Sequence, residues 1–156
     1  MSEHAAVQEQ ETREDVKLEI RRVIKARRSR VFASWTTPEL MQRWFAPSGM
    51  RVASASADLR IGGEYRVEIR GVDDAVYIAA GVYRKIVPDE LLSFTWNNAC
   101  DPDKETLVTL KFRDLENGTE LILTHEHFSS ADAAARHERG WNGCLDKLEE
   151  LSPEAS

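Results

Sequence analysis

The sequence is short of cysteine, of excess basic charge and of long apolar runs. Its two cysteines, Cys100 and Cys144, lack the spacing of a metal site, and so few thiols fit a reducing compartment. The polar residues 1–4 are followed by no apolar core of a signal peptide, and no run is long enough to span a membrane. We therefore expect a cytoplasmic protein without a membrane partner.

Charge and missing motifs exclude further classes. The formal net charge of −6 argues against nucleic acid as a partner, because phosphate binding needs a basic face. The one basic run, Arg27, Arg28 and Arg30, is expected to be a solvated helix start. The sequence contains no phosphate loop, dinucleotide fingerprint or nucleophile elbow. We expect no cofactor, and we favour a non-enzymatic role while leaving activity open.

What the sequence does contain is one long amphipathic segment, residues 129–151. Ser129 and Asp132 predict the start of a helix there, and Pro153 predicts its end. Apolar residues at spacings of three and four predict that one face of this helix is buried. The buried stripe consists of Trp141, Cys144, Leu145, Leu148 and Leu151, with His137 one turn earlier.

Two glycines, Gly140 and Gly143, stand on either side of Trp141 in that helix. Each costs about 1 kcal/mol relative to alanine in a helix interior, so something is expected to approach the backbone closely. Tight packing against a sheet is the first explanation, and room for a ligand is the second.

The rest of the chain predicts a single domain. Residues 1–15 are polar and aperiodic, which indicates a disordered tail, and the domain then covers residues 16–152. An alternating segment predicts a strand over residues 16–26, and two short helices follow, the second starting at Pro38 after Thr37 as its cap. Six further strands are predicted, joined mostly by tight turns, with a polar loop over residues 97–104.

Consecutive hairpins make an antiparallel sheet, whose apolar face must be covered by the one long helix. We therefore predict an α+β fold in which a curved antiparallel sheet wraps around the C-terminal helix. The two short helices lie between the first and second strands and could close one end. Whether the interior is solid or hollow stays open. The aromatic residues available to fill it are Trp35, Trp44, Phe45, Tyr65, Tyr83, Phe94, Trp96 and Trp141.

Several motifs resemble one known family. They are VFASWTTPEL at residues 31–40, RWFAP at 43–47, DLRIGGEY at 58–65, LSFTW at 92–96 and GTEL at 118–121, followed by His137, Gly140 and Trp141 on the last helix. In this order they resemble the activator of Hsp90 ATPase homologue-like proteins of the START-like (SRPBCC) superfamily, which has a helix-grip fold. The resemblance covers residues 16–151. Phe45 departs from it, because many relatives have a second tryptophan there.

The resemblance implies a role as well as a fold. Most relatives are small bacterial proteins thought to bind hydrophobic small molecules, whereas the eukaryotic namesake domain docks onto a chaperone ATPase and stimulates it. We hypothesise non-enzymatic binding of a hydrophobic or aromatic small molecule between the sheet and the long helix. The alternatives are a protein-interaction module acting as a chaperone co-factor, and a cyclase-like or hydrolase-like enzyme using His125. A homodimer is also left open.

His125 and His127 would share one face of a strand and could together bind a metal, but a third ligand is missing and we expect none. His125 shares parity with Leu121 and Leu123, so it should face the helix as a polar anchor or as a satisfied core histidine. No catalytic residue is assigned. The predicted ligand-binding residues are Tyr65, Tyr83, Trp96 and Trp141 as walls, Trp44 and Phe45 near the entrance, and His125 as the anchor.

Overall fold

The structure, a computed structural model, describes residues 16–98 and 101–155. The predicted tail and Cys100 lie outside the described residues. The elements are, in order, β1 (Lys17–Ile24), α2 (Arg28–Thr36), α3 (Pro38–Met41), β2 (Arg51–Ala57), β3 (Glu64–Arg70), the 3-10 turn η1 (Val72–Asp74), β4 (Val76–Val87), β5 (Leu91–Asn98), β6 (Asp101–Leu115), β7 (Gly118–Glu126) and α4 (Ala131–Ala155).

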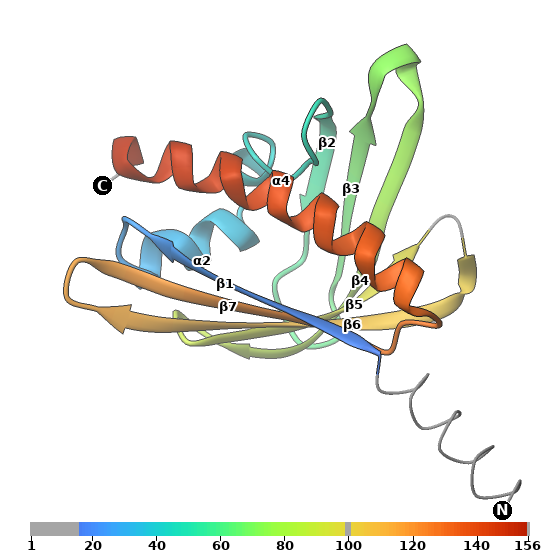
Figure 1. Cartoon of the computed structure of the whole chain (residues 1–156). Helices are drawn as coiled ribbons and strands as arrows, with labels where there is room; N and C mark the ends of the chain where they lie inside the picture. Colours follow the sequence, from blue (N-terminus) through green and yellow to red (C-terminus); the bar gives the residue numbers. More distant parts are fainter. Residues whose placement is uncertain (1–15, 99–100, 156) are drawn as a thin grey trace, which may run out of the picture.

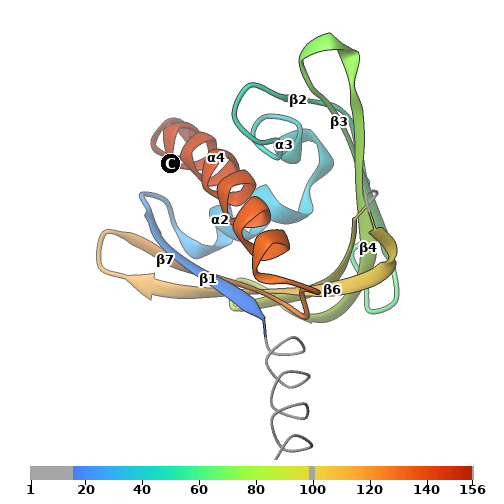
Figure 2. The ribbon, with the colours of Figure 1, turned by 45° about the vertical axis from the view of Figure 1, so that its right-hand side comes forward.

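The strands form one seven-stranded sheet in the order β1-β7-β6-β5-β4-β3-β2, and every neighbouring pair is antiparallel. The sheet curves around α4, which lies inside the curve, and α2 and α3 fill the space at one end (Figures 1 and 2). The predicted fold class is confirmed. In the part of the chain that the structure describes, no helix combines the length and apolarity that crossing a bilayer would require.

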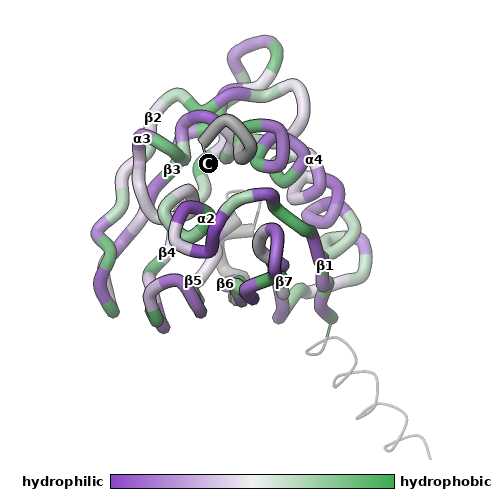
Figure 3. Tube along the Cα trace, turned by 90° about the vertical axis from the view of Figure 1, so that its left-hand side faces the viewer, coloured by the Kyte–Doolittle hydropathy of each residue, from purple (hydrophilic) through white to green (hydrophobic). Residues whose placement is uncertain are grey.

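Burial follows the predicted periodicities. Along β7 buried residues alternate with half-buried ones, so that Leu121, Leu123 and His125 point towards α4. Polar and apolar positions also alternate along the strands in the hydropathy view (Figure 3). On α4 the predicted stripe is buried at Trp141, Cys144, Leu145 and Leu148, and Leu151 packs against it from a half-buried position. Each sheet face and helix face is therefore set by side-chain spacing alone.

The short helices close one end through aromatic packing. Trp35 of α2 and Trp44, just beyond α3, meet edge to face with ring centroids 4.5 Å apart. The indole N–H of Trp44 donates to the carbonyl of Ser34 at 3.0 Å. Pro38 opens α3 as predicted, but the Thr37 side chain makes no capping hydrogen bond. Both tryptophans are 2% exposed, so this end of the interior is solid.

The ladder between β4 and β5 is interrupted at one point by side chains. The amide of Val82 donates to Thr95 Oγ1 at 2.8 Å, and the hydroxyl of Tyr65 donates to the carbonyl of Thr95 at 2.6 Å. A Cβ on Gly81 would lie 1.9 Å from that same carbonyl oxygen, so only glycine fits there. A side-chain hydrogen bond is thus found between Ala80 and Tyr83, where the pairing of β4 with β5 is interrupted.

Two basic side chains, Lys147 and Arg22, attach α4 to the rest of the fold. Lys147 Nζ donates to the carbonyls of Ala46, Pro47 and Met50 at 2.9, 3.0 and 2.9 Å, which uses all three ammonium protons. On β1, Arg22 has the parity of the buried residues and pairs with Asp146 and Glu149 of α4. The loop after α3 and the edge strand β1 are therefore both held to the helix.

Three details of the sequence prediction are wrong. The side chain that caps α4 is Ser130, whose Oγ accepts from the amide of Ala133 at 3.1 Å, rather than Ser129. The helix continues through Pro153 to Ala155, because a proline in the last turn removes only one intrahelical hydrogen bond. The polar segment 97–104 is mostly strand, since β5 extends to Asn98 and β6 begins at Asp101.

Candidate functional site

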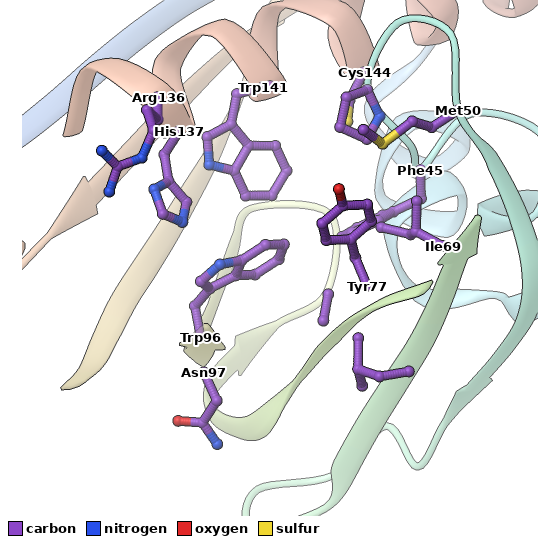
Figure 4. A pocket seen from close by; sticks show the side chains of 14 residues that line it. Phe45, Met50, Ile69, Tyr77, Trp96, Asn97, Arg136, His137, Trp141 and Cys144 are labelled. Carbon is purple, nitrogen blue, oxygen red and sulfur yellow. The ribbon is translucent and has the colours of Figure 1, made fainter. Parts of the chain in front are cut away.

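The interior is hollow on the side away from α2. A cavity of about 370 Å³ lies between α4 and the part of the sheet formed by β3, β4 and β5 (Figure 4). Its walls are largely apolar; Arg136, His137 and Asn97 lie towards one end, and the Tyr77 hydroxyl lies away from them (Figure 4). The residues that line it are Phe45, Pro47, Met50, Ile69, Tyr77, Ile78, Ala79, Trp96, Asn97, Arg136, His137, Gly140, Trp141 and Cys144.

Sheet register and helix spacing bring these residues together. Ile69 of β3 pairs directly with Tyr77 of β4, so both side chains project to the same side of the sheet. On α4, His137, Trp141 and Cys144 recur at spacings of four and three and face the sheet. The aromatic walls are close, because the rings of Trp96 and Trp141 are 4.9 Å apart at their centroids.

A chain of hydrogen bonds connects these two tryptophans through the fully buried His125. The indole N–H of Trp141 donates to His125 Nδ1 at 3.0 Å, and Thr106 Oγ1 lies 2.7 Å from His125 Nε2. The Thr106 hydroxyl also donates to the backbone carbonyl of Trp96 at 3.0 Å. An indole N–H can only donate, so Nδ1 carries no proton and Nε2–H must donate to Thr106. The network therefore requires the neutral Nε2–H tautomer.

Burial reinforces that protonation state. Desolvation, with a smaller contribution from nearby His137, lowers the pKa of His125 well below its usual value. His137 is half-buried, and its pKa is also lowered, first by desolvation. The thiol of Cys144 is buried, which raises its pKa to about 12. At neutral pH the cavity is thus lined by one neutral imidazole, that of His137, and by a protonated thiol, which is a poor nucleophile.

Comparison with known proteins identifies the fold family. Residues 25–152 match the model of the family described as Activator of Hsp90 ATPase homolog 1-like protein. The chain belongs to this family. No curated protein matches the sequence.

Solved structures of Activator of Hsp90 ATPase homolog 1-like proteins and their neighbours share the fold. A protein from Nitrosomonas europaea is 20% identical with a TM-score of 0.77, covering 90% of this chain and 96% of its own. The AHSA1-like protein from Aeromonas hydrophila is 23% identical, TM-score 0.77, covering 90% and 94%. The AHSA1 protein from Silicibacter pomeroyi is 24% identical, TM-score 0.76, covering 89% and 99%.

Within this family member, the structure separates the predicted site residues into two groups. Phe45, Trp96 and Trp141 line the cavity. Tyr65 and Tyr83 instead border a void of about 10 Å³ in the aromatic core, which is too small for more than a water molecule. Trp44 lies in the solid end, bonded to Ser34, and His125 lies behind Trp141. These last residues support the walls from outside the cavity.

The two helix glycines have different surroundings. A Cβ on Gly143 would lie 2.7 Å from the amide nitrogen of Ser48, so Gly143 allows the loop after α3 to pack against the helix backbone. A Cβ on Gly140 would meet only Pro47 Cγ at 3.7 Å, and Gly140 borders the cavity. Close packing against a loop, rather than against the sheet, therefore explains Gly143. Gly140 has room for a methyl group, which would make one ordinary van der Waals contact.

Several lining residues were not singled out from the sequence as site residues. Tyr77, near the start of β4, is 42% exposed. Asn97 on a strand and Arg136 on a helix are polar residues that the hydrophobic periodicity assigns to solvent, although both line the cavity. His137 and Cys144 were placed on the buried stripe without a role in the site. A tyrosine and an asparagine at strand ends, beside a helix with a glycine gap, are the signal that could have found them.

His125 of β7 and His127, just beyond this strand, do not share a face, contrary to the prediction. His127 has φ 75° and is exposed beyond the end of the strand, whereas His125 is completely buried. The backbone changes direction between them, because the following residue, Phe128, is again buried in the core and is 2% exposed. Among the described residues, no group of three His, Cys, Asp or Glu side chains is placed to hold a metal.

Proposed function

We propose that this protein is a non-enzymatic binding domain for a hydrophobic or aromatic small molecule, held in the cavity between the sheet and α4. The observation that supports the proposal is the cavity itself. Its volume of about 370 Å³ falls in the range of roughly 300–1,000 Å³ that is typical of small-molecule sites. Apolar walls with a few polar groups at one end are the usual composition of such sites.

Aromatic side chains favour a flat or ring-containing ligand. Phe45 lies 6.1 Å from Trp96 and 5.8 Å from Trp141 between ring centroids, so three rings border one space. Offset and edge-to-face contacts with such rings contribute about 0.5–1.5 kcal/mol each beyond the buried area. Met50 adds a flexible thioether that adapts to the shape of what binds.

His125 has a supporting role in this proposal. Both of its ring nitrogens are occupied, by Trp141 and by Thr106, and its side chain is 0% exposed. It fixes the orientation of the Trp141 indole and so the width of the cavity, without touching the ligand. An acid–base reaction at His125 would require this network to open first. We place the binding in the cytoplasm, as the cysteine usage suggests.

The test is native mass spectrometry of the freshly purified protein, compared with its denatured mass. We expect a reproducible excess mass that is lost on denaturation and that identifies the ligand. In Gly140→Leu a side chain should grow into the cavity from an open position, and the excess mass should disappear. Gly140→Ala adds only one methyl group and serves as the matched control that retains it.

Retention of the ligand by folded Gly140→Leu would contradict the cavity as the binding place. Trp141→Ala distinguishes binding from protein docking. It should abolish small-molecule binding, whereas an interaction module acting on a chaperone through its surface would keep its activity if the fold survives.

A further inference from the structure

The cavity is asymmetric in polarity, and this asymmetry constrains what the proposed function would bind. In Figure 4 Arg136, His137 and Asn97 lie towards one end, whereas Met50 and Cys144 lie towards the other. Resting on the proposed function, we infer that the ligand is an amphipathic anion, an aromatic or aliphatic acid, whose carboxylate lies at the Arg136 end.

The charge inventory of the lining supports an anion. Arg136 is the only charged side chain among the described residues that line the cavity, and no aspartate or glutamate accompanies it there. His137 contributes no charge of its own. Its Nδ1–H donates to the carbonyl of Ala133 at 2.9 Å, and its pKa is lowered by desolvation, so the ring is neutral at pH 7. The described lining therefore has a net charge of +1.

Arg136 also differs from the arginine that fastens α4 to the sheet. Arg22 is compensated by Asp146 and Glu149, which together neutralise it. Among the described side chains Arg136 forms no such ion pair, and its positive charge lowers the pKa of the neighbouring His137. A guanidinium presents parallel N–H donors that match a carboxylate, so Arg136 is available to a carboxylate group of a ligand.

The ligand would lie along the cavity with its polar end near solvent. Its apolar body would contact Trp96 and Trp141, and its carboxylate would accept from Arg136. Because Arg136 is exposed, the charge preference should be modest. An uncharged polar head could still accept a hydrogen bond from Arg136 but would lose the charge assistance, and a cation would be repelled.

The experiment compares two probes with the same ring system and nearly the same shape, charged 2-naphthoate and neutral 2-naphthamide, by isothermal titration calorimetry at low salt. We expect the wild-type protein to bind 2-naphthoate about fivefold more tightly, the preference of a partly exposed ion pair. Arg136→Gln should abolish this difference, so that the two probes bind that variant with equal affinity. Arg139→Gln is the matched control, because Arg139 lies on α4 outside the cavity lining and is exposed.

The outcomes separate this inference from the proposed function. Equal affinity for both probes, or a preference that persists in Arg136→Gln, would overturn the anionic head group and leave the binding function standing. Absence of binding by either probe to wild-type protein would contradict both the aromatic-ligand function and the inference that rests on it. A preference lost equally in Arg139→Gln would assign the effect to general surface charge and would also overturn the inference.

Discussion

Lowering the pH should destabilise the fold through His125. The ordinary histidine pKa of about 6.5 applies to the unfolded chain, whereas the folded protein holds the ring neutral because its pKa is well below that value. Between these two pKa values the unfolded state binds more protons, so stability is complete above pH 6.5 and falls as the pH falls. If the folded ring stays neutral throughout, the loss from pH 7.5 to pH 5.5 is about 1.4 kcal/mol.

The assay is urea unfolding followed by far-UV circular dichroism at both pH values. For each variant, the quantity compared is the difference between its unfolding free energies at pH 7.5 and at pH 5.5. Any destabilisation by the substitution that does not depend on pH cancels in this difference. In His125→Gln this change should be smaller than in wild type by about 1.4 kcal/mol. His127→Gln should leave it unaltered, because His127 is exposed. His137, which is half-buried with a lowered pKa, adds a contribution of the same sign to every variant that retains it.

An unchanged pH dependence in His125→Gln would refute the assignment of a neutral, doubly bonded imidazole. Should that variant not fold, the imidazole of wild-type protein can be titrated by NMR. A His125 ring that titrates near pH 6.5 in the folded protein would refute it equally.

Three further substitutions test how α4 is attached. Lys147→Met should lose about 1–3 kcal/mol in urea unfolding, because three hydrogen-bonded backbone carbonyls lose their donor, whereas Lys111→Met on the exposed face of β6 should change little. Gly143→Ala should lower the melting temperature, since its methyl group would lie 2.7 Å from the Ser48 amide. Gly140→Ala should instead gain up to about 1 kcal/mol, because helix propensity improves in open space. A stabilised Gly143→Ala, or an unaffected Lys147→Met, would contradict the described contacts.

Periodicity was sufficient to predict most of the fold. The alternation along β7 and the three-and-four spacing on α4 are each a property of a single element. The order of residues within that element is therefore sufficient to predict which of its faces is buried. Caps and ends were less predictable, because Ser129 and Ser130 are chemically equivalent candidates. Which serine points at the helix depends on where the chain leaves β7.

The candidate site was predictable only in part. Phe45, Trp96 and Trp141 were identified because large aromatic residues of known parity must face the interior. Alternation along a strand predicts which face of the sheet a side chain occupies, but not where in the interior it lies. Tyr65 was therefore assigned to the cavity walls, although it borders the smaller void. Arg136 was missed because its position in the cavity depends on where α4 crosses the sheet, which no single element encodes.

The interruption in the ladder between β4 and β5 has an evolutionary consequence. Tyr65, Gly81 and Thr95 meet at one carbonyl oxygen, and none of the three borders the cavity. A larger residue at position 81 would displace that carbonyl and so remove the acceptor of the tyrosine hydroxyl. Among related sequences we therefore expect these three positions to change together. The shape of the cavity would then be conserved among relatives through residues that do not contact a ligand.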